Sequence, residues 1–527
     1  MLFRFLLIVP FAGSVFLTSG KLVNATNTPK YYFVVLSLLA ITAFVAVSQK
    51  RITLVFSNKT TFWGISIICF LQACYGLIQF EGWLPSNHSK FAITGSFDNP
   101  AGFAAILAMG FPIGLYLLAK SKKVERYLSV IILAVVAIAV FLSNSRTGIL
   151  AIIISLVVFS ICRTKIANRF SQLRYRKLLA TFIIVCTVVG VFILYNQKKD
   201  SANGRFLIWK VSSRMINDKP ICGHGHGAFQ AKYMDYQAEY FKNNTDSKYA
   251  QLADNVKHPF NEFMKVAVEF GIAGLTVILS FVLFILWKLI KSENENKTLV
   301  LSGLSSFFIL ACFSYPLQYV AVWLLGAFYL AALLPLKEIH IKNTPALIVT
   351  RGVIVIVCVY FLFYTCCQIS AEIKWKTIAI NSLRGNTEKM LPEYEKLYSS
   401  SLKHNPYFLY NYGAELNYMG KFDNSIDVLT ECRKRFDDYD LQLLMADNYH
   451  KKGELGKAIQ IYQHASNMAP CRFIPFYQIF EIYKSIGQMD MASVYANKII
   501  NKKVKIPSGS VSYFQNEAKT FLNEIKP

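Results

Sequence analysis

The sequence predicts an all-α polytopic membrane protein of about eleven transmembrane helices, followed by a C-terminal α-solenoid. Hydrophobic residues make up 54% of the 527 residues and charged residues only 17%, and the apolar positions cluster in long runs. A soluble globular protein would not need such runs. In the more polar C-terminal region Gly420, Gly453 and Gly487 recur at nearly constant spacing, which is typical of stacked helix pairs.

The predicted transmembrane helices are apolar runs close to the roughly 20 residues that cross a hydrocarbon core. The first run carries Arg4 and has features of a signal peptide, but no small-residue cleavage site follows cleanly, so we interpret it as a retained helix. The predicted spans are residues 2–16, 31–48, 62–80, 101–119, 127–142, 148–162, 178–195, 263–289, 299–315, 317–336 and 347–367.

Basic residues indicate the orientation of these spans. They fall in alternate loops, which are therefore predicted to be cytoplasmic, with the N-terminus inside and the C-terminus outside. This belt accounts for much of the net charge of +25, and no basic-aromatic platform or helix-turn-helix pattern points to nucleic acid. The residues concerned are Lys50, Arg51, Lys59, Lys120, Lys122, Lys123, Arg126, Arg163, Lys165, Arg169, Arg174, Arg176, Lys177, Lys288, Lys291, Lys297, Lys337 and Lys342.

The chain changes character after Cys367, and two domains are expected, a transmembrane domain over residues 1–368 and a repeat domain over residues 371–527. In the latter the three glycines lie 33 and 34 residues apart, the tetratricopeptide period. Small residues, Ser425, Ala458 and Ala492, follow each glycine by five positions. Such stacks commonly bind partners; a domain that only braces the membrane part is the alternative.

Three polar segments are predicted to lie on the outer face of the membrane. The first, Ser143–Gly148, is a short turn between two apolar spans, and it holds Arg146 close to the membrane surface. A guanidinium suits a bidentate grip on phosphate. Pairing of Arg146 with lipid head groups is the alternative.

The second segment begins at Asn203 and lies in the long outer loop, residues 196–262. Its apolar residues would cover one side of a helix lying on the bilayer surface, with Lys210 and Arg214 on the other side. Arg205, at the start of that helix, is a second candidate anion ligand. The glycine-rich stretch Gly223–Phe229 follows, but its two histidines lack a cysteine or acid at matching spacing, so they predict no metal site.

The third segment, Lys257–Glu262, opens an apolar span. Pro259 at the first helical position would make His258 the N-cap of that helix, and helix N-termini bind anions. Asn261 and Glu269 follow at helical spacing, together with Lys265. A plain capping role for His258, and a structural ion pair of Glu269 with a buried arginine, remain as alternatives.

These motifs resemble the superfamily of O-antigen ligases, Wzy-type polymerases and bacterial protein O-oligosaccharyltransferases. The resemblance rests on Ser143–Gly148, on Gly204–Trp209 with Pro220–Gly225, and on His258–Asn261 followed by Glu269–Gly274, and it spans roughly residues 95–336. The family often carries a histidine directly before the asparagine, where this chain has Phe260. His258 matches the first histidine of the common His-x-His-Asn form.

The resemblance implies a multi-pass protein of the bacterial inner membrane with a periplasmic repeat domain, and an inverting, metal-independent glycosyltransferase. The donor would be a glycan on undecaprenyl diphosphate. Arg146 and Arg205 would neutralise the leaving diphosphate, and His258 would orient or deprotonate the acceptor hydroxyl. Asn261, Lys210, Arg214 and Glu269 would bind substrate, without metal or cofactor. Asp235 with Glu239 is interpreted as a solvated helix face.

The acceptor remains open at this stage. Lipid A core would make the protein an O-antigen ligase, a protein Ser or Thr would make it an oligosaccharyltransferase, and a growing lipid-linked glycan would make it a Wzy-type polymerase. Ligase-type transfer ranks first, and the repeats would recruit a protein partner. A non-catalytic glycan transporter or assembly component is the competing class, although transporters commonly place charges near the membrane midplane.

Overall fold

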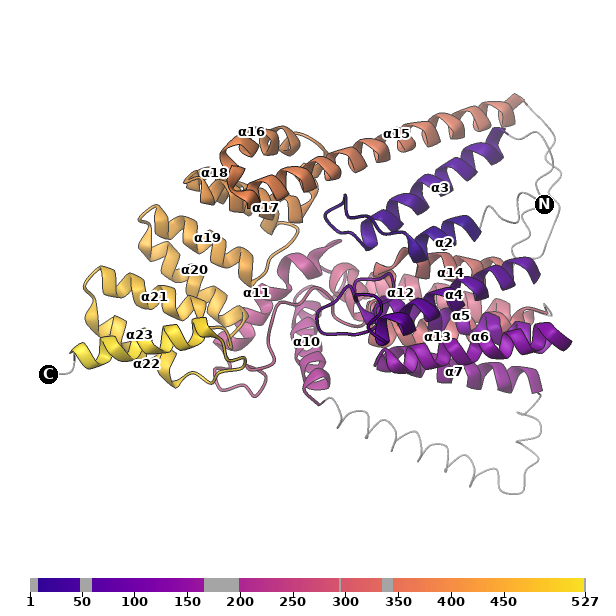
Figure 1. Cartoon of the computed structure of the whole chain (residues 1–527), viewed down its shortest axis with the longest axis horizontal. Coiled ribbons are helices and arrows are strands. Elements are labelled where there is room, and N and C mark those ends of the chain that lie inside the picture. The colour runs from indigo at the N-terminus through magenta and orange to yellow at the C-terminus, as the bar shows by residue number, and fades with distance from the viewer. Residues whose placement is uncertain (1–7, 48–58, 165–198, 293–294, 334–344, 526–527) are drawn as a thin grey trace, which may run out of the picture. The chain divides into compact units, whose positions relative to one another are not determined.

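The computed structural model describes residues 8–47, 59–164, 199–292, 295–333 and 345–525 (Figure 1). Throughout these residues the regular secondary structure is helical, and no strand occurs among them. The predicted all-α class is confirmed for this part of the chain. The predicted span at residues 178–195 lies outside the described residues, as do the basic residues Lys50, Arg51, Lys165, Arg169, Arg174, Arg176, Lys177, Lys337 and Lys342.

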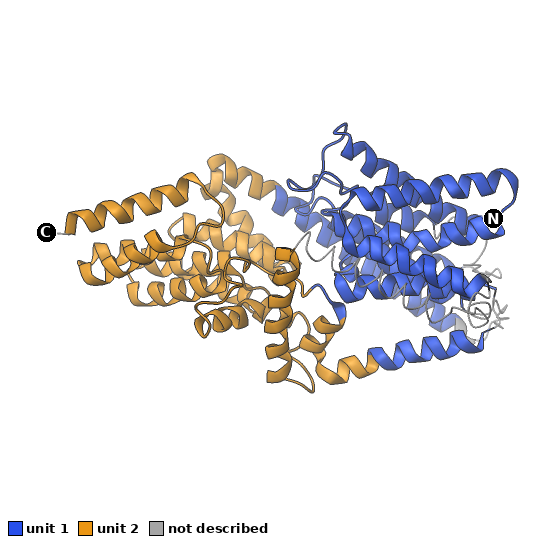
Figure 2. Cartoon of the chain, turned by 90° about the horizontal axis from the view of Figure 1, so that it is seen from below, with its two compact units in different colours: residues 1–194, 260–262, 278–376 blue, residues 195–259, 263–277, 377–527 orange. Residues whose placement is uncertain are grey.

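The chain divides into two compact units, coloured separately in Figure 2. Unit 1 comprises residues 1–194, 260–262 and 278–376, and unit 2 comprises residues 195–259, 263–277 and 377–527. The outer loop predicted within the transmembrane domain therefore groups mostly with the C-terminal helices. The expected boundary after residue 368 falls inside a continuous helix, α15 (Pro345–Asn381), and the unit changes after Lys376.

Unit 1 is a bundle of apolar helices around α5, whose apolar and small residues are buried almost along its whole length. Asn99 caps the start of α5 by accepting from the N–H of Ala101, and Pro100 occupies its first turn. Gly102, for example, allows the ring of Tyr319 to pack against the α5 backbone. The helices wholly in unit 1 are α2 (Ile8–Phe16), α3 (Asn27–Val47), α4 (Lys59–Phe80), α5 (Pro100–Lys120), α6 (Lys123–Leu142), α7 (Arg146–Thr164), α13 (Lys297–Phe313), η1 (Pro316–Gln318) and α14 (Val320–Ala331).

Seven helices in the described residues are long and apolar enough to cross a membrane, and α13 and α14 are shorter apolar helices. The chain is therefore a multi-pass membrane protein, as predicted. The count of eleven spans stays a prediction. Two apolar helices cross the unit boundaries, α15 and α12 (Glu262–Lys291), and α12 is interrupted at Gly271.

Unit 2 combines the outer-loop helices α10 (Lys199–Asp218) and α11 (Ala228–Lys242) with a series of consecutively packed helices. Gly420, Gly453 and Gly487 each adopt positive φ between two paired helices, and Ser425, Ala458 and Ala492 are fully buried. The helix pairs thus lie where the period predicts them; their assignment to the tetratricopeptide family stays a prediction. The remaining helices are η2 (Ser382–Asn386), α16 (Thr387–Tyr398), η3 (Ser401–His404), α17 (Pro406–Tyr418), α18 (Phe422–Arg433), α19 (Tyr439–Lys451), α20 (Leu455–Met468), α21 (Ile474–Ser485), α22 (Met489–Asn501) and α23 (Gly509–Ile525).

Candidate functional site

The predicted arginine turn lies between α6 and α7 in unit 1. Arg146 is the first residue of α7 and is half-buried. The hydroxyl of Ser143 donates to the carbonyl of Val140 at 2.7 Å, and Ser145 Oγ accepts from the N–H of Gly148 at 3.3 Å. Asn144 closes the turn with a φ of 56°. These local hydrogen bonds shape the turn from which the side chain of Arg146 projects.

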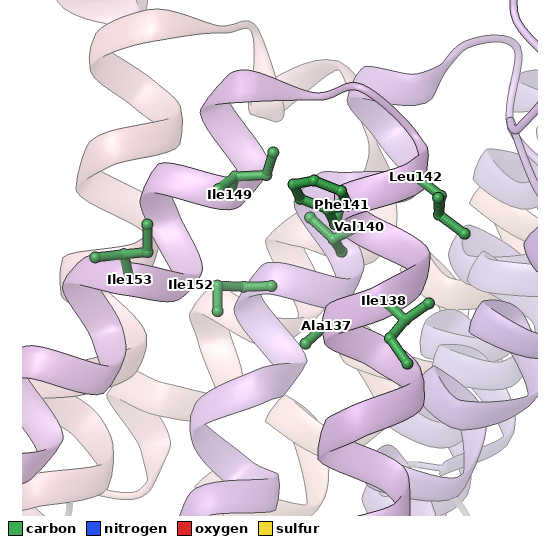
Figure 3. A pocket seen from close by; sticks show the side chains of 8 residues that line it. All are labelled: Ala137, Ile138, Val140, Phe141, Leu142, Ile149, Ile152 and Ile153. Atoms are coloured by element: carbon green, nitrogen blue, oxygen red, sulfur yellow. The ribbon is translucent and has the colours of Figure 1, made fainter. Parts of the chain in front are cut away.

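An apolar groove follows this turn along α6 and α7 (Figure 3). Its volume is about 380 Å³. Phe141 and Leu142 come just before the turn, and Ile149 comes three residues after Arg146, so a cation stands beside a hydrophobic groove. The lining residues are Ala137, Ile138, Val140, Phe141, Leu142, Ile149, Ile152 and Ile153.

Helix α10 in unit 2 carries the second predicted arginine. The helix begins at Lys199, so Arg205 lies within it and not at its start, which corrects the sequence-based placement. Four residues later Trp209 donates its indole N–H to the carbonyl of Pro259 at 2.9 Å. Residues four apart share a helix face, so the face of α10 that carries Arg205 is attached beside His258. Trp209 is a site residue that the sequence did not predict. Its position four residues after Arg205 nevertheless indicates that the two share a helix face.

Lys210 and Arg214, predicted to bind substrate, both lie against one aromatic ring. The ammonium of Lys210 is 5.1 Å and the guanidinium carbon of Arg214 is 5.0 Å from the ring centroid of Tyr240 on α11. Such cation–π contacts hold long side chains in place. The two cations therefore form one basic patch at the junction of α10 and α11.

The glycine-rich loop closes over a break in α12. The N–H groups of His224 and Gly225 donate to the carbonyls of Val268 and Glu269, both at 2.9 Å. On the other side of the break, the carbonyls of Pro220 and Ile221 accept from the N–H groups of Ile272 and Ala273 at 2.8 and 3.1 Å. The loop thus satisfies backbone groups that the interrupted helix leaves open.

Two glycines make this contact possible. Gly271 has φ 62° and ψ −160°, a region that is essentially restricted to glycine. A Cβ there would lie 2.2 Å from the carbonyl oxygen of Ile221, and a Cβ on Gly223 would lie 2.5 Å from the backbone of Glu269. The run of small residues Gly271–Gly274 therefore begins with the glycine that interrupts α12.

Glu269 is buried beside the break, with 3% of its surface exposed. Its Oε2 lies 3.7 Å from Nδ1 of His226, whose ring is exposed. Among the described residues no hydrogen-bond partner reaches its Oε1. The neighbour of this carboxyl is therefore a histidine of the glycine-rich loop, whereas the ion pair considered from the sequence was with an arginine.

His258 is not the N-cap of α12, because the helix begins only at Glu262. Phe260 has a φ of 55°, which is incompatible with a right-handed helical turn and delays the helix start by three residues. Pro259 instead presents its carbonyl to Trp209. Burial, followed by the charges of Lys265 and Lys257, lowers the pKa of His258 to about 4. Its imidazole is therefore neutral at neutral pH.

Asp235 is an ion-pair residue and not part of a solvated face. Its Oδ1 lies 2.8 Å from Nε2 of His464 and 3.1 Å from the Arg433 guanidinium. Arg433 also pairs with the buried Asp437 at 2.8 Å. This network joins α11 to the helix pairs within unit 2, and no short-range pattern in the sequence predicts it.

The predicted site residues fall in both compact units. Arg205, Lys210, Arg214, His258 and Glu269 belong to unit 2, whereas Arg146 and Asn261 belong to unit 1. Asn261 directly precedes the first residue of α12. Within the described ranges, no group of three or more His, Cys, Asp or Glu side chains is arranged to hold a metal ion.

Residues 129–279 match the family model Wzy_C, described as O-Antigen ligase. All seven predicted site residues lie inside this range. A protein of Rickettsia conorii, named "Putative polysaccharide ligase", is 25% identical to the chain over 256 residues. The match covers 45% of this chain and 58% of the relative, so the chain spans little more than half the length of that protein.

Proposed function

We propose that this chain, whose membrane part belongs to the O-antigen ligase superfamily, transfers a glycan en bloc from undecaprenyl diphosphate to an acceptor hydroxyl. The reaction would take place at the periplasmic face of the bacterial inner membrane, with the N-terminus in the cytoplasm and the helix pairs in the periplasm. The acceptor would be lipid A core or a protein Ser or Thr.

The observation that carries the proposal is the attachment of the α10 face bearing Arg205 to the His258 segment through Trp209 and Pro259. A permanent cation and a neutral imidazole on adjoining segments are the two groups that this transfer needs. The acceptor oxygen attacks the anomeric carbon, the bond from that carbon to the phosphate oxygen breaks, and the configuration inverts. The lipid diphosphate leaves with the bonding electrons.

The arginines act on the leaving group. Arg146 and Arg205 bind the diphosphate oxygens and offset the negative charge that develops as the bond breaks. The apolar groove of α6 and α7 beside Arg146 supports a lipid-borne donor, because an isoprenoid chain would lie against such a surface. No metal ion or cofactor has a role in this scheme.

His258 acts on the acceptor. A neutral imidazole can accept a hydrogen bond from the acceptor hydroxyl, orient it, and receive its proton as the new glycosidic bond forms. Asn261, Lys210, Arg214 and Glu269 bind the glycan or its carrier. A Wzy-type polymerase, in which the acceptor is a second lipid-linked glycan, would use the same groups.

Glycan pools in cells test this proposal. Cells without the chain, and cells carrying Arg146→Ala or Arg205→Ala, are expected to lose glycan from lipopolysaccharide or from periplasmic proteins and to accumulate it on the lipid carrier. Mass spectrometry of lipopolysaccharide and of periplasmic proteins shows which pool has lost its glycan, and that pool contains the acceptor. If glycan-loaded carrier instead stayed on the cytoplasmic side, the chain would be a transporter and the proposal would be wrong.

A further inference from the structure

The segment Gln251–Lys257, directly before His258, lies along the turns that join one helix pair of unit 2 to the next. The start of the segment contacts the last of these turns and its end contacts the first. The segment therefore runs antiparallel to the order of the helix pairs. The pairings along it are Gln251 with Lys503, Ala253 with Cys471, Asp254 with Arg472, Asn255 with Asp438, Tyr439 and Asp440, and Lys257 with Phe436 and Tyr407.

Asn255 is the centre of this contact. Its Nδ2 donates to Oδ2 of Asp440 at 2.9 Å and to Oδ2 of Asp438 at 3.3 Å, and its Oδ1 accepts from the N–H of Tyr439 at 3.1 Å. Only an amide offers a donor to two carboxylates and an acceptor to a backbone N–H at the same time. Asp438 also caps α19 by accepting from the N–H of Leu441, so the amide is held at a rigid helix start.

Two cations anchor the segment on either side of Asn255. The guanidinium of Arg472 lies 2.6 Å from Asp254 and 3.6 Å from Asp440, and it stacks over the ring of Tyr439 at 4.6 Å. The ammonium of Lys257 lies 5.2 Å from the ring centroid of Tyr407. The fixed part of the segment therefore reaches the residue immediately before His258.

Holding a segment without regular structure in one place costs conformational entropy. The contacts of Asn255, Asp254 and Lys257 offset that cost. The helix pairs hold the chain up to Lys257, and Trp209 holds the carbonyl of Pro259. His258 is thus fixed from both sides. A catalytic group that is displaced by about 1 Å can lose on the order of 100-fold in rate.

We propose that the helix pairs position His258, with Asn255, Asp438 and Asp440 as the positioning residues. The turns between the helix pairs are thus in contact with the chain's own outer loop. The inference rests on the proposed function, in which His258 acts on the acceptor hydroxyl.

Asn255→Asp tests the inference in the purified full chain, reconstituted with lipid-linked glycan donor and acceptor. The substitution keeps the size of the side chain but places a carboxylate against Asp438 and Asp440. We expect kcat to fall about 10- to 100-fold, while KM for the donor stays unchanged because no donor contact is altered. Asn255→Asp with Asp440→Asn restores an amide donor opposite the carboxylate and should recover most of kcat.

Asn497→Asp is the matched control, since Asn497 is an exposed residue of α22 that bonds only to its own helix at Ser493 among the contacts described. It should leave kcat unchanged. If Asn255→Asp fails to accumulate as folded protein, Asn255→Ala, which adds no charge, takes its place.

The outcomes separate the inference from the proposed function. Normal kcat in Asn255→Asp together with an inactive His258→Ala overturns the positioning role and leaves the proposed function intact. Normal kcat in His258→Ala overturns the role of His258 in the proposed function, and the inference with it. A loss in Asn255→Asp that the double variant does not recover also contradicts the inference.

Discussion

The arginine turn and the histidine segment carry the two proposed halves of the chemistry, and they are held in different ways. Arg146 follows a turn whose hydrogen bonds join residues three or four positions apart, such as Ser143 with Val140. His258 follows a segment whose partners lie as far as 252 positions away in the sequence. The first can form as soon as α6 and α7 pack together, whereas the second depends on the folded helix pairs between Tyr407 and Lys503.

Because different contacts hold the two regions, a substitution can impair one of them without impairing the other. Substitutions in the helix pairs should affect the acceptor step through His258 and leave donor binding at Arg146 unchanged. The long-range arrangement also depends on close backbone contacts, which tolerate no added atoms at Gly223 and Gly271. We therefore expect the largest effects where these contacts are broken.

Gly271→Ala should break the long-range arrangement most strongly. The backbone conformation of Gly271 costs a non-glycine residue about 1–3 kcal/mol, and the new Cβ would collide with the carbonyl of Ile221. We expect a lower yield of folded protein and a lower midpoint for thermal loss of the helical circular dichroism signal in detergent.

Gly352→Ala is the matched control for this prediction. It lies in α15, has ordinary helical φ, and a Cβ added there meets no atom within 4 Å. Its thermal midpoint should equal or slightly exceed that of the unmodified chain, because alanine favours the helix. Equal midpoints for Gly271→Ala and Gly352→Ala would show that the loop does not close on the helix break as described.

The same difference explains what could be predicted from the sequence. Apolar runs, the glycine period and the serine–arginine turn are short-range patterns, and they predicted the helical class, the helix pairs and a turn between α6 and α7, although α7 already begins at Arg146. The N-cap assignment of His258 failed because Pro259 signals a helix start only when the next residue is helical, and Phe260 has positive φ. The contacts of Asp235 and Asn255 were not predictable, since their partners lie beyond residue 430.

A smaller effect, on the pH dependence of the transfer rate, is expected from the charges near His258. Burial, and after it Lys265 and Lys257, lowers the pKa of His258 to about 4. The imidazole is thus protonated only at acid pH, and the transfer rate should stay constant from about pH 8 to about pH 5 and fall near pH 4. Lys265→Gln removes a positive charge and raises the pKa, so the acid limb should move upward by less than about one pH unit.

The control for the pH profile is Lys457→Gln, an exposed lysine of α20 that pairs with Glu454. Both variants use the same donor and acceptor, so titration of the substrates cancels in the comparison. An acid limb that stays in place in Lys265→Gln would indicate that His258 does not take the proton.

Single-turnover transfer by His258→Ala tests the central claim most directly. The purified variant, reconstituted with a polyprenyl-diphosphate glycan and an acceptor, is expected to bind donor as tightly as the unmodified chain, since the arginines are intact. Transfer should be slower by about 10²- to 10⁴-fold, the usual contribution of a general base. Transfer at the unmodified rate would contradict the account, because His258 would then have no part in the reaction.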